Sequence, residues 1–124
     1  QKQNAQNKSL AKSSEKSNVV IHQADASNLV FVKDKSVDVI ITDPPWGFFQ
    51  GDLRDDKKLL LLYESMLKEF ERIIKPDGTI CLLTGAKNIF EEAAEKLNLK
   101  YERNDVLVNG KKAAVYIWKN YLED

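Results

Sequence analysis

Hydrophobic residues recur along this chain with two different periods, which predict alternating helices and strands. Between Leu59 and Ile74 the apolar positions are three and four residues apart, the spacing of a helix with one buried face. Pro76 and Gly78 follow, and we expect them to end this helix, with the glycine in a left-handed turn. The expected inner face consists of Leu59, Leu62, Tyr63, Met66, Phe70, Ile73 and Ile74.

Short runs rich in β-branched residues predict strands at residues 19–22, 36–42 and 79–84. The run at 36–42 is apolar almost throughout, which is typical of a strand covered on both faces in a parallel sheet. After the third run, Gly85 opens a second helical pattern. The inner face of that helix is expected to be Ile89, Phe90, Ala93, Ala94 and Leu97.

The end of the chain predicts an antiparallel hairpin. Residues 101–108 and 111–119 are two strand-like runs that flank Asn109 and Gly110, the dipeptide best suited to a type I′ turn. The whole pattern therefore predicts an α/β fold in which parallel strands are closed by a C-terminal antiparallel hairpin.

Composition limits the class of protein. The 124 residues are 43% hydrophobic, enough for a single domain spanning 1–124, in which residues 1–18 are expected to be a helix end and a Ser/Lys-rich loop. Lys and Arg number 19, as do Asp and Glu, so the net charge is zero and any nucleic acid must be held partly by another region. No apolar run approaches the roughly 20 residues that cross a bilayer, so we expect a soluble, cytoplasmic or nuclear protein without a membrane partner.

Cysteine usage excludes two classes of site. Cys81 is the only cysteine, which rules out a disulfide framework and a cysteine-rich zinc site. Its apolar neighbours predict a buried thiol in a reducing compartment, and we expect no metal ligands.

The candidate catalytic motif is the segment Asp43, Pro44, Pro45 and Trp46, which comes directly after a strand predicted to be buried. Ligands of open α/β sheets bind at the carboxyl ends of the strands. The prolines stiffen the segment and leave the carbonyls of Asp43 and Pro44 free to accept. A carboxylate beside free carbonyls can receive an amino group, and a base can stack on Trp46. The alternative is that Asp43 merely ends a strand and Trp46 packs in the core.

This D-P-P-W segment resembles the signature of class I S-adenosylmethionine-dependent methyltransferases that modify exocyclic amino groups of nucleobases. Residues 40–47, 63–78 and 106–116 extend the resemblance to the catalytic domains of THUMP-type RNA methyltransferases, which act on guanine N2, mostly in tRNA. Trp46 departs from the Phe or Tyr common in those enzymes and matches the mRNA adenine methyltransferases. Adenine N6, in RNA or DNA, therefore stays open as the target.

The resemblance implies a role for each site residue. Asp43 and the Pro44 carbonyl would accept the amino hydrogens, with Pro45 completing the catalytic motif. Trp46, with Gly47 and Phe48, would contact the flipped base. S-adenosylmethionine would be held by Asp25, Ala26 and Asp43, with Asp25 accepting from the adenine amino group. Asp25 has an alternative role as a cap of a helix or turn.

Two further candidate features, His22 and the segment after the motif, are interpreted as structural rather than catalytic. We interpret His22 as a strand residue rather than a catalyst. Phe48, Phe49 and the charged residues 51–58 predict a solvated loop after the motif, and closure over substrate is the alternative.

We expect two elements of the resembling family to be absent from these residues: a Gly-rich turn after the first strand, and an acidic residue at the end of the second strand that holds the ribose of the cofactor. No Gly-rich turn precedes Asp25, although the family uses such a turn to hold the methionine end of the cofactor. We therefore expect the C-terminal part of a Rossmann-like methyltransferase domain, with the first two strands absent and an RNA-binding region further toward the N-terminus. The resemblance also implies a small zinc-binding activator subunit.

The missing turn leaves other functions open. One is a non-catalytic interaction domain derived from a methyltransferase, and another is a bare nucleic-acid-binding module, which the zero net charge disfavours. In the family sheet, ordered 3-2-1-4-5-7-6, residues 19–22 and 37–42 would not be neighbours. Either they pair directly, or the first detaches and leaves a 4-5-7-6 sheet. In both cases we expect residues 1–124 alone to bind no cofactor, to methylate no RNA and to self-associate through an exposed strand.

Overall fold

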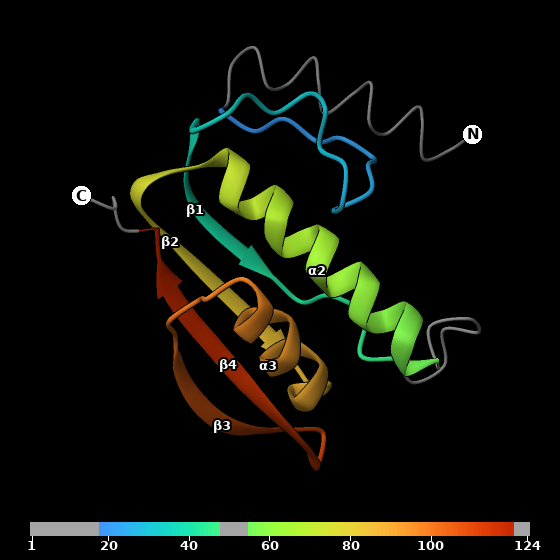
Figure 1. Cartoon of the computed structure of the whole chain (residues 1–124). Helices are drawn as coiled ribbons and strands as arrows, with labels where there is room; N and C mark the ends of the chain where they lie inside the picture. The colour runs from blue at the N-terminus through green and yellow to red at the C-terminus, as the bar shows by residue number, and fades with distance from the viewer. Residues whose placement is uncertain (1–17, 48–54, 121–124) are drawn as a thin grey trace.

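Four strands form one mixed sheet, and two helices cover one of its faces (Figure 1). The computed structural model describes residues 18–47 and 55–120. The sheet order is β1-β2-β4-β3, which confirms the predicted α/β architecture. The elements in chain order are β1 (Val37–Thr42), α2 (Asp56–Ile73), β2 (Ile74–Thr84), α3 (Lys87–Lys96), β3 (Glu102–Val108) and β4 (Lys111–Lys119).

The pairing is parallel at one side of the sheet and antiparallel at the other. β1 pairs in parallel with β2 after the crossover through α2, and β4 lies antiparallel to both β2 and β3. Asn109 (φ 50°) and Gly110 (φ 79°) both take the left-handed conformation that a two-residue type I′ hairpin requires, as predicted. This is the 4-5-7-6 arrangement, one of the two expected outcomes.

The core lies between the sheet and its two helices. The Phe90 ring of α3 packs in its middle, with its centroid 4.0 Å from that of Tyr116 and 5.5 Å from that of Trp118. Burying an aromatic or large aliphatic side chain contributes roughly 1.5–3 kcal/mol, so this cluster holds both helices on the sheet. Its other buried members include Leu59, Tyr63, Met66, Leu67, Phe70, Ile74, Ile80, Leu82, Ala93, Ala94 and Ala114.

The opposite face of the sheet is much more open in the described residues. Val39 is 55% exposed and Ile41 79% exposed, and Cys81, beside Ile41 on β2, is only partly buried. Side chains alternate between the two faces of a strand, and both described helices lie on the same face. The predictions of a strand covered on both faces and of a buried thiol are therefore wrong.

Residues 19–22 form no strand. They run without a ladder partner, and Val19, Val20 and Ile21 are exposed. The strands that would accept them in the family sheet are not among the described elements, which explains the failure of this prediction. Neither described helix is long and apolar enough to cross a membrane.

The ends of α2 differ from the predicted ones. The helix begins at Asp56 because the side chain of Asp55 accepts from the backbone N–H of Lys57, so residues 56–58 are helical rather than part of a loop. After the helix, Asp77 (φ 63°) takes the left-handed conformation expected of Gly78. The predicted N-terminal helix end and most of the loop after the motif lie outside the described residues.

Candidate active site at the carboxyl edge of the parallel strands

Residues 43–46 follow the carboxyl end of β1, beside the carboxyl end of the parallel strand β2. Thr42 pairs with Leu82, so the motif and the residues that follow Leu82 emerge side by side. Pro44 is buried, whereas Asp43 is exposed. The structure thus anchors the motif through its first proline and presents its carboxylate to solvent.

Trp46 and Asp43 are joined directly. The indole Nε1–H donates to Asp43 Oδ1 over 2.9 Å. A hydrogen bond to a carboxylate is charge-assisted and fixes its orientation. One carboxylate oxygen is therefore held within the motif, while Asp43 itself is exposed. The sequence predicted a stacking surface at Trp46 and missed this second contact.

Gly85, directly after β2, makes room for the Trp46 ring. A Cβ at Gly85 would lie 2.4 Å from Cε3 and 2.8 Å from Cζ3 of that ring. Only glycine permits such a close approach of the backbone. The contact leaves Trp46 half-buried, neither free in solvent nor packed within the core.

Tyr63 on α2 contacts the motif through its hydroxyl group. Its hydroxyl donates to the Pro45 carbonyl over 2.6 Å and lies 2.7 Å from Thr84 Oγ1. Thr84 Oγ1 accepts from the Ala86 N–H at 2.9 Å. Burial raises the pKa of Tyr63 to about 12, and the negative charge of Asp43 acts in the same direction. The sequence predicted Tyr63 only as a core residue. The position of Thr84 and Gly85 at the end of the second parallel strand was a usable signal.

Asp25 lies in a turn rather than at the end of a strand. Its Oδ1 accepts from the hydroxyl of Ser27 at 2.7 Å and from the Ser27 N–H at 2.9 Å, and these bonds, the hydroxyl first, lower its pKa. The capping alternative is thus what the structure shows, while the exposed carboxylate keeps acceptor capacity. Ala26 packs against the core, and no hydrogen bond or ion pair between described residues joins Asp25 to Asp43.

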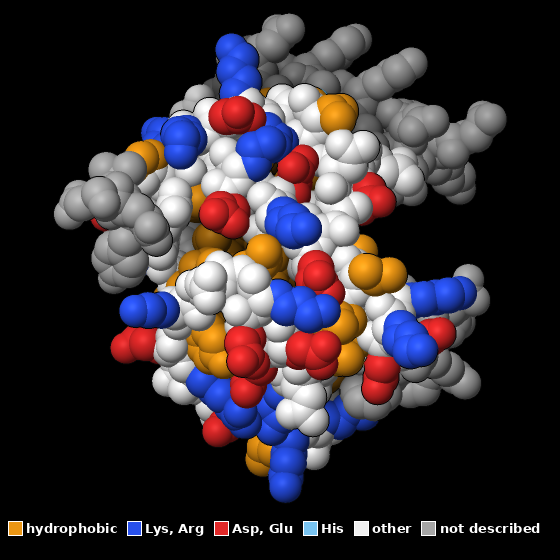
Figure 2. All heavy atoms as spheres, in the orientation of Figure 1, with side chains coloured by type: hydrophobic (Ala, Val, Ile, Leu, Met, Phe, Trp, Pro, Cys, Tyr) orange, Lys and Arg blue, Asp and Glu red, His pale blue; other side chains and the backbone are white. Residues whose placement is uncertain are grey.

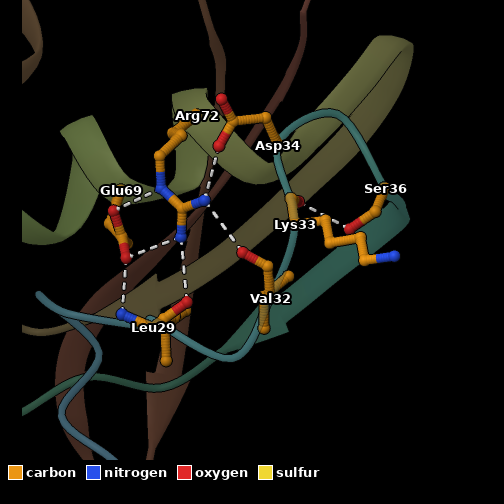
Figure 3. A network of polar contacts seen from close by, with 7 residues as sticks. All are labelled: Leu29, Val32, Lys33, Asp34, Ser36, Glu69 and Arg72. Atoms are coloured by element: carbon orange, nitrogen blue, oxygen red, sulfur yellow. Dashed lines mark hydrogen bonds and ion pairs between the residues drawn. The ribbon is translucent and has the colours of Figure 1, made fainter.

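Arg72 on α2 clamps the segment that follows Asp25 (Figure 3). Its guanidinium donates to the carbonyls of Leu29 (2.9 Å) and Val32 (2.8 Å) and to Asp34 Oδ1 (2.7 Å). Glu69 accepts from Arg72 and from the Leu29 N–H, and these bonds lower the pKa of Glu69 to about 2. This clamp, which fixes residues 29–34 on the helix, had no sequence signal.

The remaining predicted site residues are dispersed. Gly47 follows Trp46 with a φ of 91°, and Phe48 lies outside the described residues. The His22 ring stacks on Phe31 with centroids 4.1 Å apart, and no described interaction connects it to the motif.

A protein-family model matches most of the chain. The model of the UPF0020 family, the RMKL-like methyltransferase domain, matches residues 2–113. The chain belongs to this methyltransferase family. The prediction of an S-adenosylmethionine-dependent methyltransferase is therefore confirmed at the level of the family.

Two of the curated proteins similar to the chain are tRNA methyltransferases. The chain is 34% identical over 101 residues to the mouse tRNA (guanine(6)-N(2))-methyltransferase THUMP3 and 36% identical to the bovine one. In each case the match covers 78% of this chain and 19% of the relative, so the chain spans about a fifth of the length of these proteins.

Solved structures share the fold. TrmN from Thermus thermophilus superposes with a TM-score of 0.67 at 24% identity, over 90% of this chain and 31% of TrmN. A second Thermus thermophilus protein, described as a DNA modification methylase and solved in complex with S-adenosyl-L-methionine, gives a TM-score of 0.64 at 14% identity. That match covers 83% of this chain and 56% of the other.

Proposed function

We propose that this chain carries the catalytic motif of an enzyme that methylates an exocyclic amino group of a nucleobase in RNA, with guanine N2 of tRNA as the target. The supporting observation is the exposed Asp43 carboxylate that follows the carboxyl end of β1, with one oxygen held by Trp46. The tRNA guanine-N2 relatives support the choice of base and of RNA.

The chain's residues would act by alignment. An exocyclic amino nitrogen is a poor nucleophile because its lone pair is conjugated with the ring. Asp43 Oδ2 and the Pro44 carbonyl accept its two hydrogens and direct the lone pair toward the methyl carbon. The nitrogen becomes positive as its bond to carbon forms, and the carboxylate stabilises that charge. The exposed part of the Trp46 ring stacks on the base, worth roughly 1–3 kcal/mol.

S-adenosylmethionine supplies the methyl group on a sulfonium leaving group. The described residues fit its adenine end: the lowered pKa of Asp25 keeps an exposed carboxylate ionised, and that carboxylate retains an acceptor for an amino group. Ala26 anchors the turn on the core, and Arg72 holds the next segment on α2.

The tRNA partner needs contacts beyond the face that α2 and α3 present. Figure 2 shows Lys and Arg side chains interspersed with Asp and Glu on that face instead of a continuous basic surface. Salt-dependent phosphate binding requires clustered positive charge. A separate RNA-binding region is therefore part of this proposal, whereas the zinc-binding activator and the cellular compartment stay predictions.

Adenine N6 is a second candidate, favoured by the presence of Trp46 in the motif. The Trp46 indole donates a hydrogen bond to Asp43, which a Phe ring at this position cannot do. The D-P-P-W motif therefore orients its acceptor carboxylate in a way that a D-P-P-F motif does not. Nucleoside analysis of the product separates the two candidates, because N2-methylguanosine and N6-methyladenosine are resolved by chromatography.

The test uses the full-length protein that carries these residues and measures transfer of labelled methyl groups from S-adenosylmethionine to unmodified bulk tRNA. We expect Asp43→Ala to abolish transfer and Asp43→Asn to keep part of it, because the amide oxygen still accepts. Asp38→Ala is the matched control, since this exposed carboxylate of β1 pairs with Lys75 away from the motif. Full activity of Asp43→Ala would overturn the assignment, and an inactive wild type would favour the non-catalytic interaction domain.

A further inference from the structure

We propose that Tyr63 is a positioning residue of the methyl-transfer site, because its hydroxyl holds the Pro45 carbonyl and thereby fixes the peptide that leads to Trp46, whose indole orients the Asp43 carboxylate. This inference rests on the proposed function and deepens it. It gives Tyr63, a residue of α2 outside the motif, control over the orientation of the carboxylate that the motif presents.

The directions of the hydrogen bonds follow from donor counting. A carbonyl oxygen can only accept, so the single hydroxyl proton of Tyr63 goes to Pro45. Thr84 must then donate its own proton to the Tyr63 oxygen, 2.7 Å away. Thr84 Oγ1 in turn accepts from the Ala86 N–H. The chain of bonds therefore runs in one direction, from the residue before α3 through β2 and α2 to the motif.

Burial makes this tether rigid. Tyr63 and Thr84 are both fully buried, and every buried side-chain nitrogen or oxygen of the described residues has a partner. A buried hydroxyl left without its partner is costly, so neither group releases its bond readily. The raised pKa of Tyr63 keeps the proton in place throughout the neutral range.

The atom held by Tyr63 is the Pro45 carbonyl oxygen, which sets the orientation of the peptide between Pro45 and Trp46. Pro45 has no N–H, so its carbonyl is its only backbone polar group. When that carbonyl is held, the peptide plane between Pro45 and Trp46 is fixed, and with it the direction from which the indole reaches Asp43. If the carbonyl is released, the peptide plane turns, and both the indole bond and the carboxylate it orients shift.

The first experiment reads the geometry of the motif without any activity. In a heteronuclear NMR spectrum, the indole N–H signal of Trp46 is identified by its loss in Trp46→Phe. We expect Tyr63→Phe to shift that signal. Tyr101→Phe is the matched control: it removes the same hydroxyl from a ring that contacts Phe90 and Tyr116, and it should leave the signal in place. An unchanged indole signal in folded Tyr63→Phe would overturn the proposal.

The second experiment uses the methyl-transfer assay and a rescue. Since a displacement of about 1 Å can cost as much as about 100-fold in rate, we expect Tyr63→Phe to lower kcat by roughly tenfold to 100-fold with an unchanged KM for S-adenosylmethionine. Thr84→Val should shift the indole signal in the same way, and Thr84→Ser should restore it. If Tyr63→Phe does not fold, the indole signals of Thr84→Val and Thr84→Ser test the tether in its place, and an unchanged signal in folded Thr84→Val would overturn the proposal. A shifted indole signal in a protein without methyl transfer would support the tether and refute only the proposed function.

Discussion

Replacing Gly85 by alanine should displace Trp46, and the structure sets the size of the effect. The new Cβ would lie 2.4 Å from Cε3 of the ring, whereas carbon atoms in contact are about 3.5–4.0 Å apart. The ring must therefore move by about 1 Å. The Nε1 to Oδ1 distance is now 2.9 Å, so such a movement stretches or breaks the bond to Asp43.

We expect a loss of about 1–3 kcal/mol in the free energy of unfolding, the usual cost of overpacking. Urea unfolding followed by far-ultraviolet circular dichroism measures it. The control is the same change in a Trp46→Leu background, where the ring carbons that cause the clash are absent and Gly85→Ala should cost much less. Equal losses in the two backgrounds would refute the reasoning, because the clash would not involve the indole.

The segment before β1 provides further tests. Arg72→Ala should free residues 29–34 from α2, seen as faster proteolytic cleavage there, while Lys68→Ala, an exposed change on the same helix, should not. The pKa of Glu69 is about 2 when folded and near 4.5 when unfolded, so its stabilising effect is complete above pH 4.5 and is lost as the pH falls toward 2. Glu69→Gln should remove this pH dependence from the free energy of unfolding between pH 4.5 and 2. An unchanged pH dependence in that range would contradict the role given to Glu69. Asp25→Ala should raise the cofactor dissociation constant about tenfold with the maximal rate retained, and unchanged calorimetric binding would return Asp25 to its capping role.

The sequence predicted the elements whose signals are local. Helical spacing gave α2 and α3, the Asn109 and Gly110 pair gave the hairpin, and the motif was recognisable because its prolines and aromatic ring are contiguous. The contacts that shape the motif were not predictable in this way. Tyr63 and Gly85 are distant from it in sequence and meet it only when α2 packs under β1 and β2 ends beside it.

The errors also have a common physical origin. A run of apolar residues indicates burial but not which neighbour provides it. β1 and Cys81 look like interior positions, yet the face of the sheet opposite the two described helices leaves them partly or largely exposed. In the same way, the β-branched residues 19–22 favour an extended chain, but a strand also needs a partner to pair with.

The position of β1 at the end of the described sheet order determines how the motif responds to thermal opening. β2 is paired on both sides, whereas β1 is held by one parallel ladder, which is irregular between Val37 and Val39. Local opening of an edge strand costs less free energy than opening a central one. Amide protons of β1 should therefore lose protection against hydrogen exchange before those of β2 and β4. The strand that leads into the Asp43 carboxylate is thus expected to open before the rest of the described sheet.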